Sequence, residues 1–419
     1  MKNFLLLFLF NFCVSCIGLS QSFSNTLFSQ DIASVQFYQT GNELSAPIVP
    51  LVGNKSLTVE FDYLGDDMPD FFYTITLCDK HWNQSSLLQI DYLNTIGVHY
   101  FEQVQHSVNT HVNYIHYSTT FPNNDLNILK SGNYILQVFK EGEQRVPVFQ
   151  SRFMVIEQVV RTEASLSRAS AVEYMDTHQE LDMTIYTHGF EITNPEDDLH
   201  VLYMQNGRWD NVIQGLSPSY ISDGEIEYDY ERENVFEGGR EFHHFSCKNL
   251  NVAHENVETI MFEDSLYAVY VKPNEIGLYK TYASDSDLNG YFLPAYQGAQ
   301  NADTDADYVK VYVTLPYTNT FDADTISLYV CGQFNMWQLN EQNRMEYNVE
   351  KQQYTSSLLL KQGYYDYIIG YTSSNTSGLQ TYETEGSFYQ TKNEYDVFVY
   401  YYDFSEQYDR IIGYMHMED

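Results

Sequence analysis

Apolar and polar residues alternate along much of the chain, in short runs of the kind that form β-strands. In residues 308–315, every second residue is apolar, so these side chains share one face of an extended segment. Gly, Asn, Asp and Pro separate such runs, as they do at the turns of antiparallel sheets. No stretch of a dozen residues has the period of an amphipathic helix, so the pattern predicts an all-β protein. Three further alternating runs are Leu57–Tyr63, Tyr134–Phe139 and Val148–Ile156.

Two sequence patterns recur and divide the chain. Trp82, Trp209 and Trp337 each follow a strand-like run, one in each third of the chain. The pattern Leu-Lys-x-Gly-x-Tyr occurs at 129–134 and again at 360–365. In β-sandwiches a Tyr after a Gly-bearing turn commonly fixes the corner between sheets, and a Trp packs in or beside the core. We therefore expect three consecutive immunoglobulin-like or early-set-like sandwich domains, at residues 21–157, 158–300 and 301–419.

Residues 1–20 have the composition of a secretory signal peptide. One positive charge precedes an apolar run, Phe4–Phe12, and the small residues Gly18 and Ser20 suit cleavage after Ser20. The run is shorter than the ~20 residues that span a bilayer. Lipidation of Cys16 is the alternative, which Cys13 disfavours because Leu usually stands at that position. We expect an exported protein that is soluble or peripherally attached.

The net charge limits the possible classes of binding partner, and the cysteine content bears on whether disulfides stabilise the fold. The net charge is −36, and removal of residues 1–20 takes away one Lys and no acid, giving −37. Such a chain repels nucleic acid and anionic membranes. The excess acid indicates either a solvated surface or a face that docks on a basic protein. Cys78, Cys247 and Cys331 remain after cleavage, and their odd number and wide spacing indicate no disulfide framework.

The best match to a metal-binding motif is Asp285-Ser-Asp287-Leu-Asn289-Gly290, which copies the first six positions of a calcium-binding loop. The twelfth position should supply a bidentate Glu, and here it is Tyr296. Asn289-Gly290 between apolar residues is also a favoured turn. The turn is the preferred interpretation, and calcium binding stays open.

Other clusters of titratable residues give weak signals. Asp303, Asp305 and Asp307 alternate without the Gly and Glu of a calcium loop, which favours a solvated linker. His243 and His244 are adjacent, so on a strand they face opposite sides and cannot bind one metal.

Asp176, His178 and Glu180 would share one face of a strand, but no partner nucleophile lies in a recognisable turn. None of the common hydrolase, metalloprotease or phosphate-binding motifs occurs. We therefore expect no enzymatic activity, no cofactor and no metal.

One stretch resembles the early-set β-sandwich modules of glycogen-binding and branching-enzyme-type proteins. In the sugar-binding members the Trp after Phe-Asn stacks on a sugar ring, and a second Trp usually assists it. This chain lacks the second Trp, for which Tyr347 or Tyr354 would have to substitute. The resemblance therefore implies the fold more strongly than glycan binding. Its motifs are Gly332-x-Phe334-Asn335-x-Trp337, Met345-Glu-Tyr347 and Gly363-Tyr-Tyr-x-Tyr367.

Across residues 31–414 the chain resembles the plug proteins of the type IX secretion system. Many long matches in the same order carry this resemblance. In the first third they are Asp31-Ile-Ala-Ser-Val-Gln36, Gly41-Asn-Glu-Leu44, Tyr73-Thr-Ile-Thr-Leu-Cys-Asp79 with Trp82, and Leu129-Lys-Ser-Gly-Asn-Tyr134. Later matches are Asp176-Thr-His-Gln-Glu180, Gln205-Asn-Gly-Arg-Trp-Asp-Asn211, Tyr228-Asp-Tyr-Glu-Arg-Glu-Asn-Val-Phe236, Gly238-Gly239, Trp337-Gln-Leu-Asn-Glu341, Asn343-Arg-Met-Glu-Tyr347, Gly386-Ser-Phe-Tyr389 and Tyr408-Asp-Arg410.

The resemblance implies a non-enzymatic, multi-domain, all-β protein in the periplasm, peripherally associated with the outer membrane. It implies that the protein binds the very large translocon barrel and plugs the periplasmic opening of that barrel. No motif marks the residues that contact the barrel, so the partner-binding residues stay unassigned. The alternative is an exported carbohydrate-binding protein that uses the C-terminal module.

Overall fold

The computed structural model describes residues 22–142, 146–298, 301–316, 326–373 and 376–418. The expected signal peptide and the Cys16 alternative lie outside these residues. Within them, nearly every element is a strand, which confirms the predicted all-β class, and helices are limited to single turns. No helix in the described part of the chain is long and apolar enough to cross a membrane.

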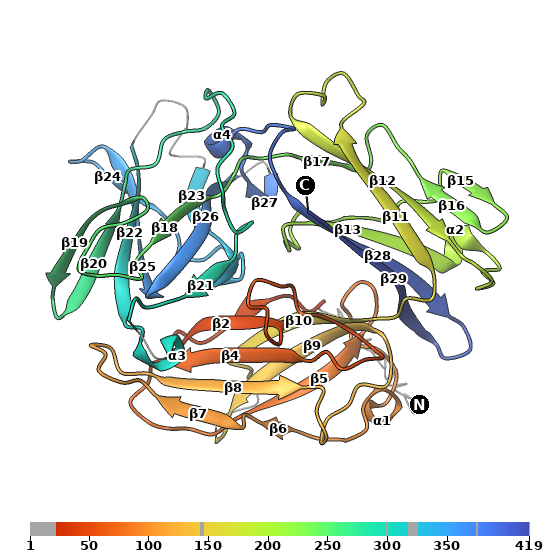
Figure 1. Ribbon diagram of the computed structural model, residues 1–419, viewed down its shortest axis with the longest axis horizontal. Helices are drawn as coiled ribbons and strands as arrows, with labels where there is room; N and C mark the ends of the chain where they lie inside the picture. The colour runs from red at the N-terminus through yellow and green to blue at the C-terminus, as the bar shows by residue number, and fades with distance from the viewer. Residues whose placement is uncertain (1–21, 143–145, 299–300, 317–325, 374–375, 419) are drawn as a thin grey trace, which may run out of the picture.

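The first sandwich is built from two antiparallel sheets joined face to face (Figure 1). One sheet has the strand order β1 (Thr26–Leu27), β10 (Phe149–Ile156), β9 (Gly132–Lys140), β5 (Phe71–Cys78) and β6 (His99–Tyr100), and β3 (Ile48–Pro50) runs parallel to β10. The other sheet has the order β2 (Ile32–Gln39), β4 (Leu57–Tyr63), β8 (Ile115–Phe121) and β7 (Gln103–His106). The single-turn helix α1 (Gln89–Tyr92) follows β5.

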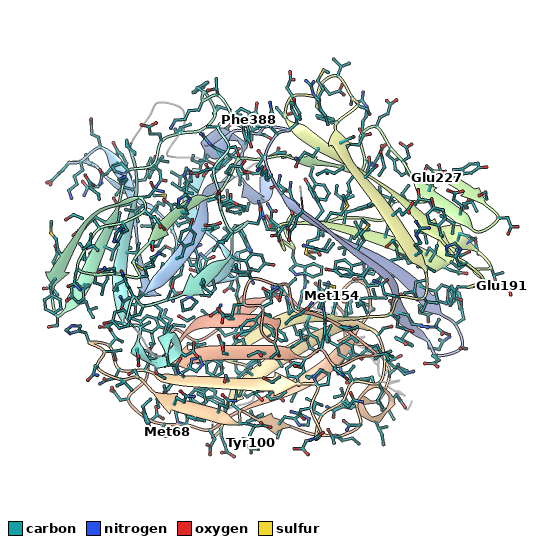
Figure 2. The ribbon with its side chains drawn as sticks, in the orientation of Figure 1. Met68, Tyr100, Met154, Glu191, Glu227 and Phe388 are labelled. Carbon is teal, nitrogen blue, oxygen red and sulfur yellow. The ribbon has the colours of Figure 1, made fainter. Side chains whose placement is uncertain are left out.

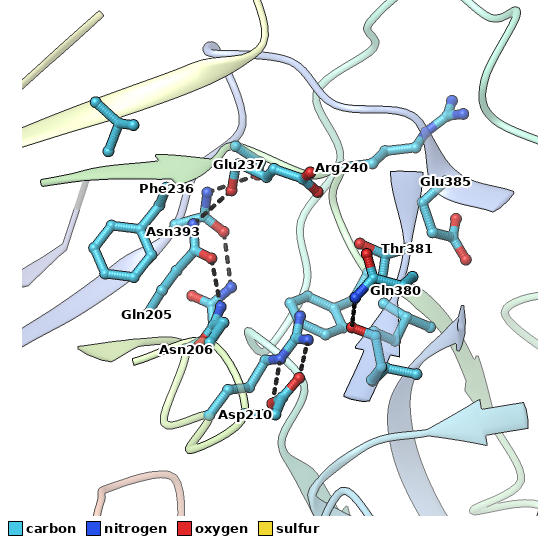
Figure 3. Close-up of a pocket in the computed structure, with 18 of the residues that line it drawn as sticks. Gln205, Asn206, Asp210, Phe236, Glu237, Arg240, Gln380, Thr381, Glu385 and Asn393 are labelled. Atoms are coloured by element: carbon cyan, nitrogen blue, oxygen red, sulfur yellow. Dashed lines mark hydrogen bonds and ion pairs between the residues drawn. The ribbon is translucent and has the colours of Figure 1, made fainter. Parts of the chain in front are cut away.

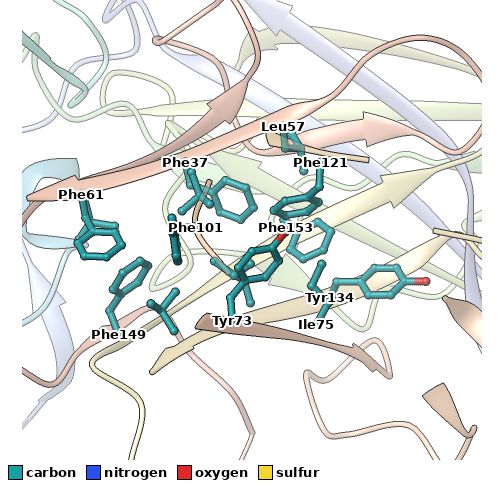
Figure 4. Packing of buried hydrophobic residues seen from close by; sticks show 14 of the residues in the cluster. Phe37, Leu57, Phe61, Tyr73, Ile75, Phe101, Phe121, Tyr134, Phe149 and Phe153 are labelled. Carbon is teal, nitrogen blue, oxygen red and sulfur yellow. The ribbon is translucent and has the colours of Figure 1, made fainter. Parts of the chain in front are cut away.

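Aromatic rings fill the space between these two sheets (Figure 4). Phe61 lies at the centre, with the rings of Phe71, Phe101, Tyr117 and Phe149 at centroid distances of 5.0, 5.1, 5.3 and 5.2 Å. Three of these contacts are edge-to-face, the arrangement that the ring quadrupole favours. The period-two alternation of β4 therefore marks a core face, as the sequence predicted.

The middle and third sandwiches are interleaved along the chain. The middle sandwich pairs a sheet of β11 (Arg161–Arg168), β12 (His178–Tyr186), β16 (Glu225–Tyr228), β15 (Tyr220–Ser222) and β17 (Val235–Glu237) with a sheet of β14 (Ile213–Gln214), β13 (Leu199–Gln205), β28 (Glu394–Asp403) and β29 (Tyr408–Glu418). The third contains β18 (His243–Ser246), β26 (Gly363–Ser373), β21 (Phe292–Pro294), β23 (Ile326–Cys331) and β27 (Thr376–Gln380) opposite β19 (Val257–Glu263), β20 (Leu266–Val271), β22 (Tyr308–Pro316), β25 (Gln353–Lys361) and β24 (Glu346–Asn348). Single helical turns are α2 (Pro195–Asp198), α3 (Ala302–Asp305), η1 (Gln333–Asn335) and α4 (Tyr382–Glu385).

These sheets group residues differently from the expected ranges 158–300 and 301–419. Strands β18 to β21 precede residue 300 yet belong to the third sandwich, and β28 returns to pair with β13 along its whole length. The reason is burial on both faces of β28. Val397 and Val399 point into the middle core, whereas Phe398 and Tyr400 pack toward the first sandwich. The third sandwich is thus an insertion within the middle one.

The two tyrosines of the repeated Leu-Lys-x-Gly-x-Tyr pattern occupy equivalent corners. The Tyr134 hydroxyl donates to the Lys130 carbonyl at 2.8 Å, and the Tyr365 hydroxyl donates to the Lys361 carbonyl at 2.6 Å. Both rings are fully buried. The predicted corner hydrogen bond is therefore confirmed in the first and third sandwiches.

The tryptophans lie between sandwiches, which the strand pattern did not predict. The rings of Trp82 and Trp209 meet edge to face at 4.8 Å, although one residue belongs to the first sandwich and the other to the middle one. The guanidinium of Arg152 lies over both rings, at 4.5 and 4.6 Å. Trp337 contacts Phe242 at 6.0 Å.

Candidate functional site

The calcium-like loop is a tight turn. Asn289 and Gly290 have φ of 51° and 88°, and the Tyr291 N–H donates to the Leu288 carbonyl at 3.0 Å. These are features of a type I′ turn. The Asp287 carboxylate accepts hydrogen bonds from the backbone of Phe242 and Asn289. Among the described residues, the carboxylates of this loop form no cluster with metal-ligand spacing.

The Asp366 carboxylate binds the backbone of the same turn. Its carboxylate accepts the Leu288 N–H and, at 3.4 Å, the Gly290 N–H, while its other oxygen is buried without a hydrogen-bond partner in the described structure. The side chain is fully buried, and this burial raises its pKa to about 8. A Cβ at position 290 would lie 2.8 Å from the Trp337 ring, so this turn requires glycine.

The weak acid–His–acid candidate of the sequence does not assemble into a site. Asp176 lies in a turn and pairs with Arg168, whereas His178 bonds Thr177 at 2.7 Å. Glu180 accepts hydrogen bonds from the backbone and hydroxyl of Ser170. The three side chains therefore have separate structural partners.

Glu180 lies instead beside Asp182 and Asp229, with carboxylate oxygens within 4.8 Å of one another. Burial, together with the charges of Asp229 and Glu180, raises the pKa of Asp182 to about 6, although the Asn234 amide opposes this by donating to its carboxylate. Three such oxygens have the spacing of divalent-cation ligands. Sequence reasoning missed this set because Asp229 comes from a loop 47 residues after Asp182 along the chain.

The remaining titratable candidates have structural partners. His243 and His244 lie on β18 and face opposite sides, as expected: His243 bonds Glu385 at 2.8 Å, and His244 stacks on Tyr364. The expected solvated linker at Asp303–Asp307 is wrong. Residues 303 and 305 lie in α3, and the buried Asp307 carboxylate accepts two backbone N–H groups of the first sandwich.

The residues of the glycan-binding alternative do not converge. The Trp337 indole donates to Gln333 at 3.1 Å, and its ring lies between Phe242 and the Arg208 guanidinium. Tyr347 and Tyr354 pack on each other at 5.0 Å, on the opposite sheet of the third sandwich. Trp337 is therefore committed to packing between sandwiches.

A polar cleft of about 250 Å³ lies where the middle and third sandwiches meet (Figure 3). Amide side chains cross it in a chain: Asn206 donates to Asn393 at 2.7 Å, and Asn393 donates to Gln179 at 2.8 Å. Arg208 binds Asp210 through two hydrogen bonds, of 3.1 and 2.7 Å. These groups all belong to the middle sandwich and order its wall of the cleft, while the Arg208 guanidinium reaches the Trp337 ring of the third sandwich at 5.0 Å.

Four of the long motifs from the sequence meet at this junction: 176–180, 205–211, 238–239 and 386–389. Ser387 donates to the Thr177 carbonyl, and Gln179 donates to the carbonyls of Tyr389 and Thr391. A Cβ at Gly238 would lie 2.0 Å from the Phe388 carbonyl oxygen. These motifs therefore specify how two sandwiches dock.

A buried ionic network joins the first and third sandwiches. Lys361 Nζ lies 2.7 Å from Asp62, and both side chains are almost completely buried. The Tyr308 hydroxyl also donates to Asp62 at 2.7 Å, and His116 Nδ1 lies 2.9 Å from the same carboxylate. The Lys361 ammonium sits 4.4 Å from the centre of the Tyr114 ring. All three sandwiches are thus tied together by polar and aromatic contacts.

Comparison with known proteins agrees with this architecture. A crystal structure of a hypothetical protein from Parabacteroides merdae superposes with a TM-score of 0.91 and 31% sequence identity, over 95% of this chain and 100% of that chain. No curated protein matches the sequence. Residues 32–157 match the family model described as "Type 9 secretion system plug protein 1st domain". In the described residues the matched first sandwich packs against two more, and this chain belongs to the plug protein family of the type IX secretion system.

Proposed function

We propose that this protein is a non-enzymatic, periplasmic component of the type IX secretion machinery that associates with the large outer-membrane translocon barrel. In this proposal it closes the periplasmic opening of the barrel while no cargo passes. The observation that carries the proposal is the family match over the first sandwich.

The docking of the three sandwiches supports this role. A body that blocks a wide pore must keep its shape against the opening. Contacts at each junction favour that: the Trp82–Arg152–Trp209 cluster, the Gln179 hydrogen bonds to the Tyr389 and Thr391 carbonyls, and the Asp62–Lys361 network. Domains that meet through small, hydrated interfaces usually move relative to one another, whereas buried contacts of this kind oppose such motion.

The charge of the protein suits a reversible closure. A plug must leave when cargo needs the path, and a large apolar interface would release slowly. Opposite charges speed encounter and contribute specificity more than affinity. We therefore assign the net charge of −37, which remains after removal of residues 1–20, a role against a basic rim on the periplasmic side of the barrel.

The test is conductance of the purified barrel in planar bilayers, with and without the protein. We expect added protein to lower the conductance, and to be retained on the barrel less well as salt rises, because screening shortens from ~8 Å at physiological strength to ~3 Å at 1 M. Equal conductance in both preparations contradicts the plugging function. Retention that stays flat up to molar salt contradicts only the electrostatic part.

A further inference from the structure

One loop of the first sandwich has its apolar side chains outside. Five apolar or aromatic residues that lie within thirteen positions of the chain are each between 46% and 70% exposed to solvent. We call this set the outer patch: Leu88, Ile90, Ile96, Val98 and Tyr100. Apolar side chains scattered singly on a surface are ordinary, whereas such a concentration marks an interaction site.

Polar side chains in the same loop point inward. Thr95 Oγ1 and His99 Nε2 are buried without a hydrogen-bond partner among the described residues. Burying a polar group unpaired costs free energy, and so does exposing Ile96 and Val98. The alternation along residues 95–100 is therefore inverted relative to what folding alone would favour, which indicates that the exposed face is retained for binding.

The loop is held firmly in this orientation. The Gly97 N–H donates to Gln89 Oε1 at 3.1 Å, which joins the two halves of the outer patch. Strand β6 pairs with β5, placing Tyr100 against Phe72, whose ring stacks on Phe139 at 5.3 Å. The surface is thus ordered without a partner.

The outer patch extends a sheet face that is already an interface at its other end. Ile135 and Met154, on the same face of the sheet, are covered by the middle sandwich. Figure 1 shows α1 and β6 on the side of the first sandwich away from the other two, and Figure 2 shows Tyr100 at that outer edge. This end of the face is left for another molecule.

Acidic side chains flank the Tyr100 end of the outer patch. Glu102 is two residues beyond Tyr100, and Glu141 accepts a hydrogen bond from the Tyr100 hydroxyl at 3.3 Å. Asp70 lies beside them, because its carbonyl accepts the Glu141 N–H. An apolar centre with a charged rim is the anatomy of a protein–protein interface.

The negative charge at the edge of the outer patch determines which kind of molecule can bind there. An anionic lipid surface would face three carboxylates, and a second copy of this chain would place acidic rims against each other. We propose that the outer patch docks a protein surface with an apolar centre and a Lys- or Arg-rich rim. This inference rests on the proposed function, since it assigns the outer patch as the contact with the barrel.

The test compares full-length variants for retention on purified translocon barrel. Ile96→Ser/Val98→Ser should weaken binding by about tenfold or more, since central apolar contacts dominate interfaces. The matched control is Val172→Ser/Val349→Ser, whose side chains are exposed on the other two sandwiches and whose variant should bind like wild type. For the rim, Glu102→Lys should weaken binding and Glu258→Lys, an exposed acid on β19, should not. Equal melting temperatures show that each variant is folded.

Four outcomes overturn the inference. If the outer-patch variant is retained as well as its control while wild type binds and blocks conductance, the contact lies elsewhere and the plugging function stands. If wild type itself is not retained, the proposed function fails and this contact with it. Binding of wild type to anionic vesicles that the Ile96→Ser/Val98→Ser variant loses would identify a lipid surface instead. Dimerisation in sedimentation experiments that the same variant abolishes would identify a second copy of the chain.

Discussion

The two corner tyrosines, Tyr134 and Tyr365, stabilise the fold through a hydrogen bond of the hydroxyl group as well as through packing of the ring. Tyr134→Phe and Tyr365→Phe keep the ring but remove the hydroxyl that donates to the carbonyl of Lys130 or Lys361. We expect each to lower the free energy of unfolding by about 0.5–1.5 kcal/mol, as for a typical net hydrogen bond. Urea denaturation measures this, with the largely exposed Tyr279→Phe as the control. Unchanged midpoints for both corner variants would contradict the prediction.

The buried Asp366 carboxyl gives the protein a pH dependence with a definite sign. Burial raises its pKa to about 8, so the folded state holds this proton more tightly than the unfolded chain, where Asp titrates near ~4. Its favourable contribution is complete below the unfolded pKa and is lost as pH rises through about 8. Asp366→Asn removes this loss. We expect the melting temperature of the variant, relative to wild type, to increase from pH 5 to pH 9.

The size of this effect is of order 1–3 kcal/mol, because one pKa unit corresponds to ~1.4 kcal/mol and local relaxation absorbs part of the shift. Asp285→Asn, an exposed carboxylate on the same loop, is the matched control. A pH-independent difference between Asp366→Asn and wild type would mean that the folded protein holds the Asp366 proton no more tightly than the unfolded chain does.

At the scale of elements, strand β10 joins two sandwiches through one side chain. The Arg152 guanidinium lies over the rings of both Trp82 and Trp209 and donates to the Phe23 carbonyl. Arg152→Ala removes two cation–π contacts, and we expect a loss of about 1–3 kcal/mol in stability. Tryptophan fluorescence should shift to longer wavelength as the rings become hydrated.

Arg152→Lys should recover part of the loss, because a lysine keeps the charge but not the planar stack. The exposed Arg161→Ala is the control and should change neither observable. A spectrum unchanged in Arg152→Ala would show that the rings stay shielded without the arginine.

Alternation in the sequence predicted single strands well and their partners poorly. Strands β4, β9, β10 and β22 follow from period two, because every second residue of each faces the core of its own sandwich and turns bound the run. Val397 to Tyr400 in β28 are apolar on both faces, which signals a fully buried strand without saying where it pairs.

The residues that join the sandwiches could not be predicted from the sequence, for other reasons. Trp82 has φ of +66° in an irregular loop, so no periodicity reports its direction. Lys361 could be recognised only as part of a corner motif, because its partner Asp62 lies 299 residues away along the chain. Long-range polar pairs leave no local pattern.

For the whole molecule, the Asp62–Lys361 pair decides how firmly the first and third sandwiches stay together. Lys361→Met leaves Asp62 buried without its cation, and breaking such a pair on one side costs about 3–5 kcal/mol. We expect faster proteolysis between the sandwiches and a larger radius of gyration in small-angle X-ray scattering.

Lys361→Met/Asp62→Asn should recover much of that loss, because the uncompensated charge is gone. A double variant as weak as Lys361→Met alone would mean that the lysine stem, and not the charge pair, holds the interface.

The insertion of the third sandwich has a consequence for synthesis. A ribosome delivers the chain from the amino end, so β13 is exposed long before β28 and β29 exist. Until then the edge of β13 that later pairs with β28 has no partner strand, and its apolar side chains, Val201 and Tyr203 among them, lack part of their core. The third sandwich can fold first, and its folding brings residues 240 and 392 close together, so that the final strands reach β13 over a shorter effective loop. The nascent protein therefore carries an unfinished sheet edge from the completion of β13 at Gln205 until β28 begins at Glu394, which is the stage at which it most needs a chaperone.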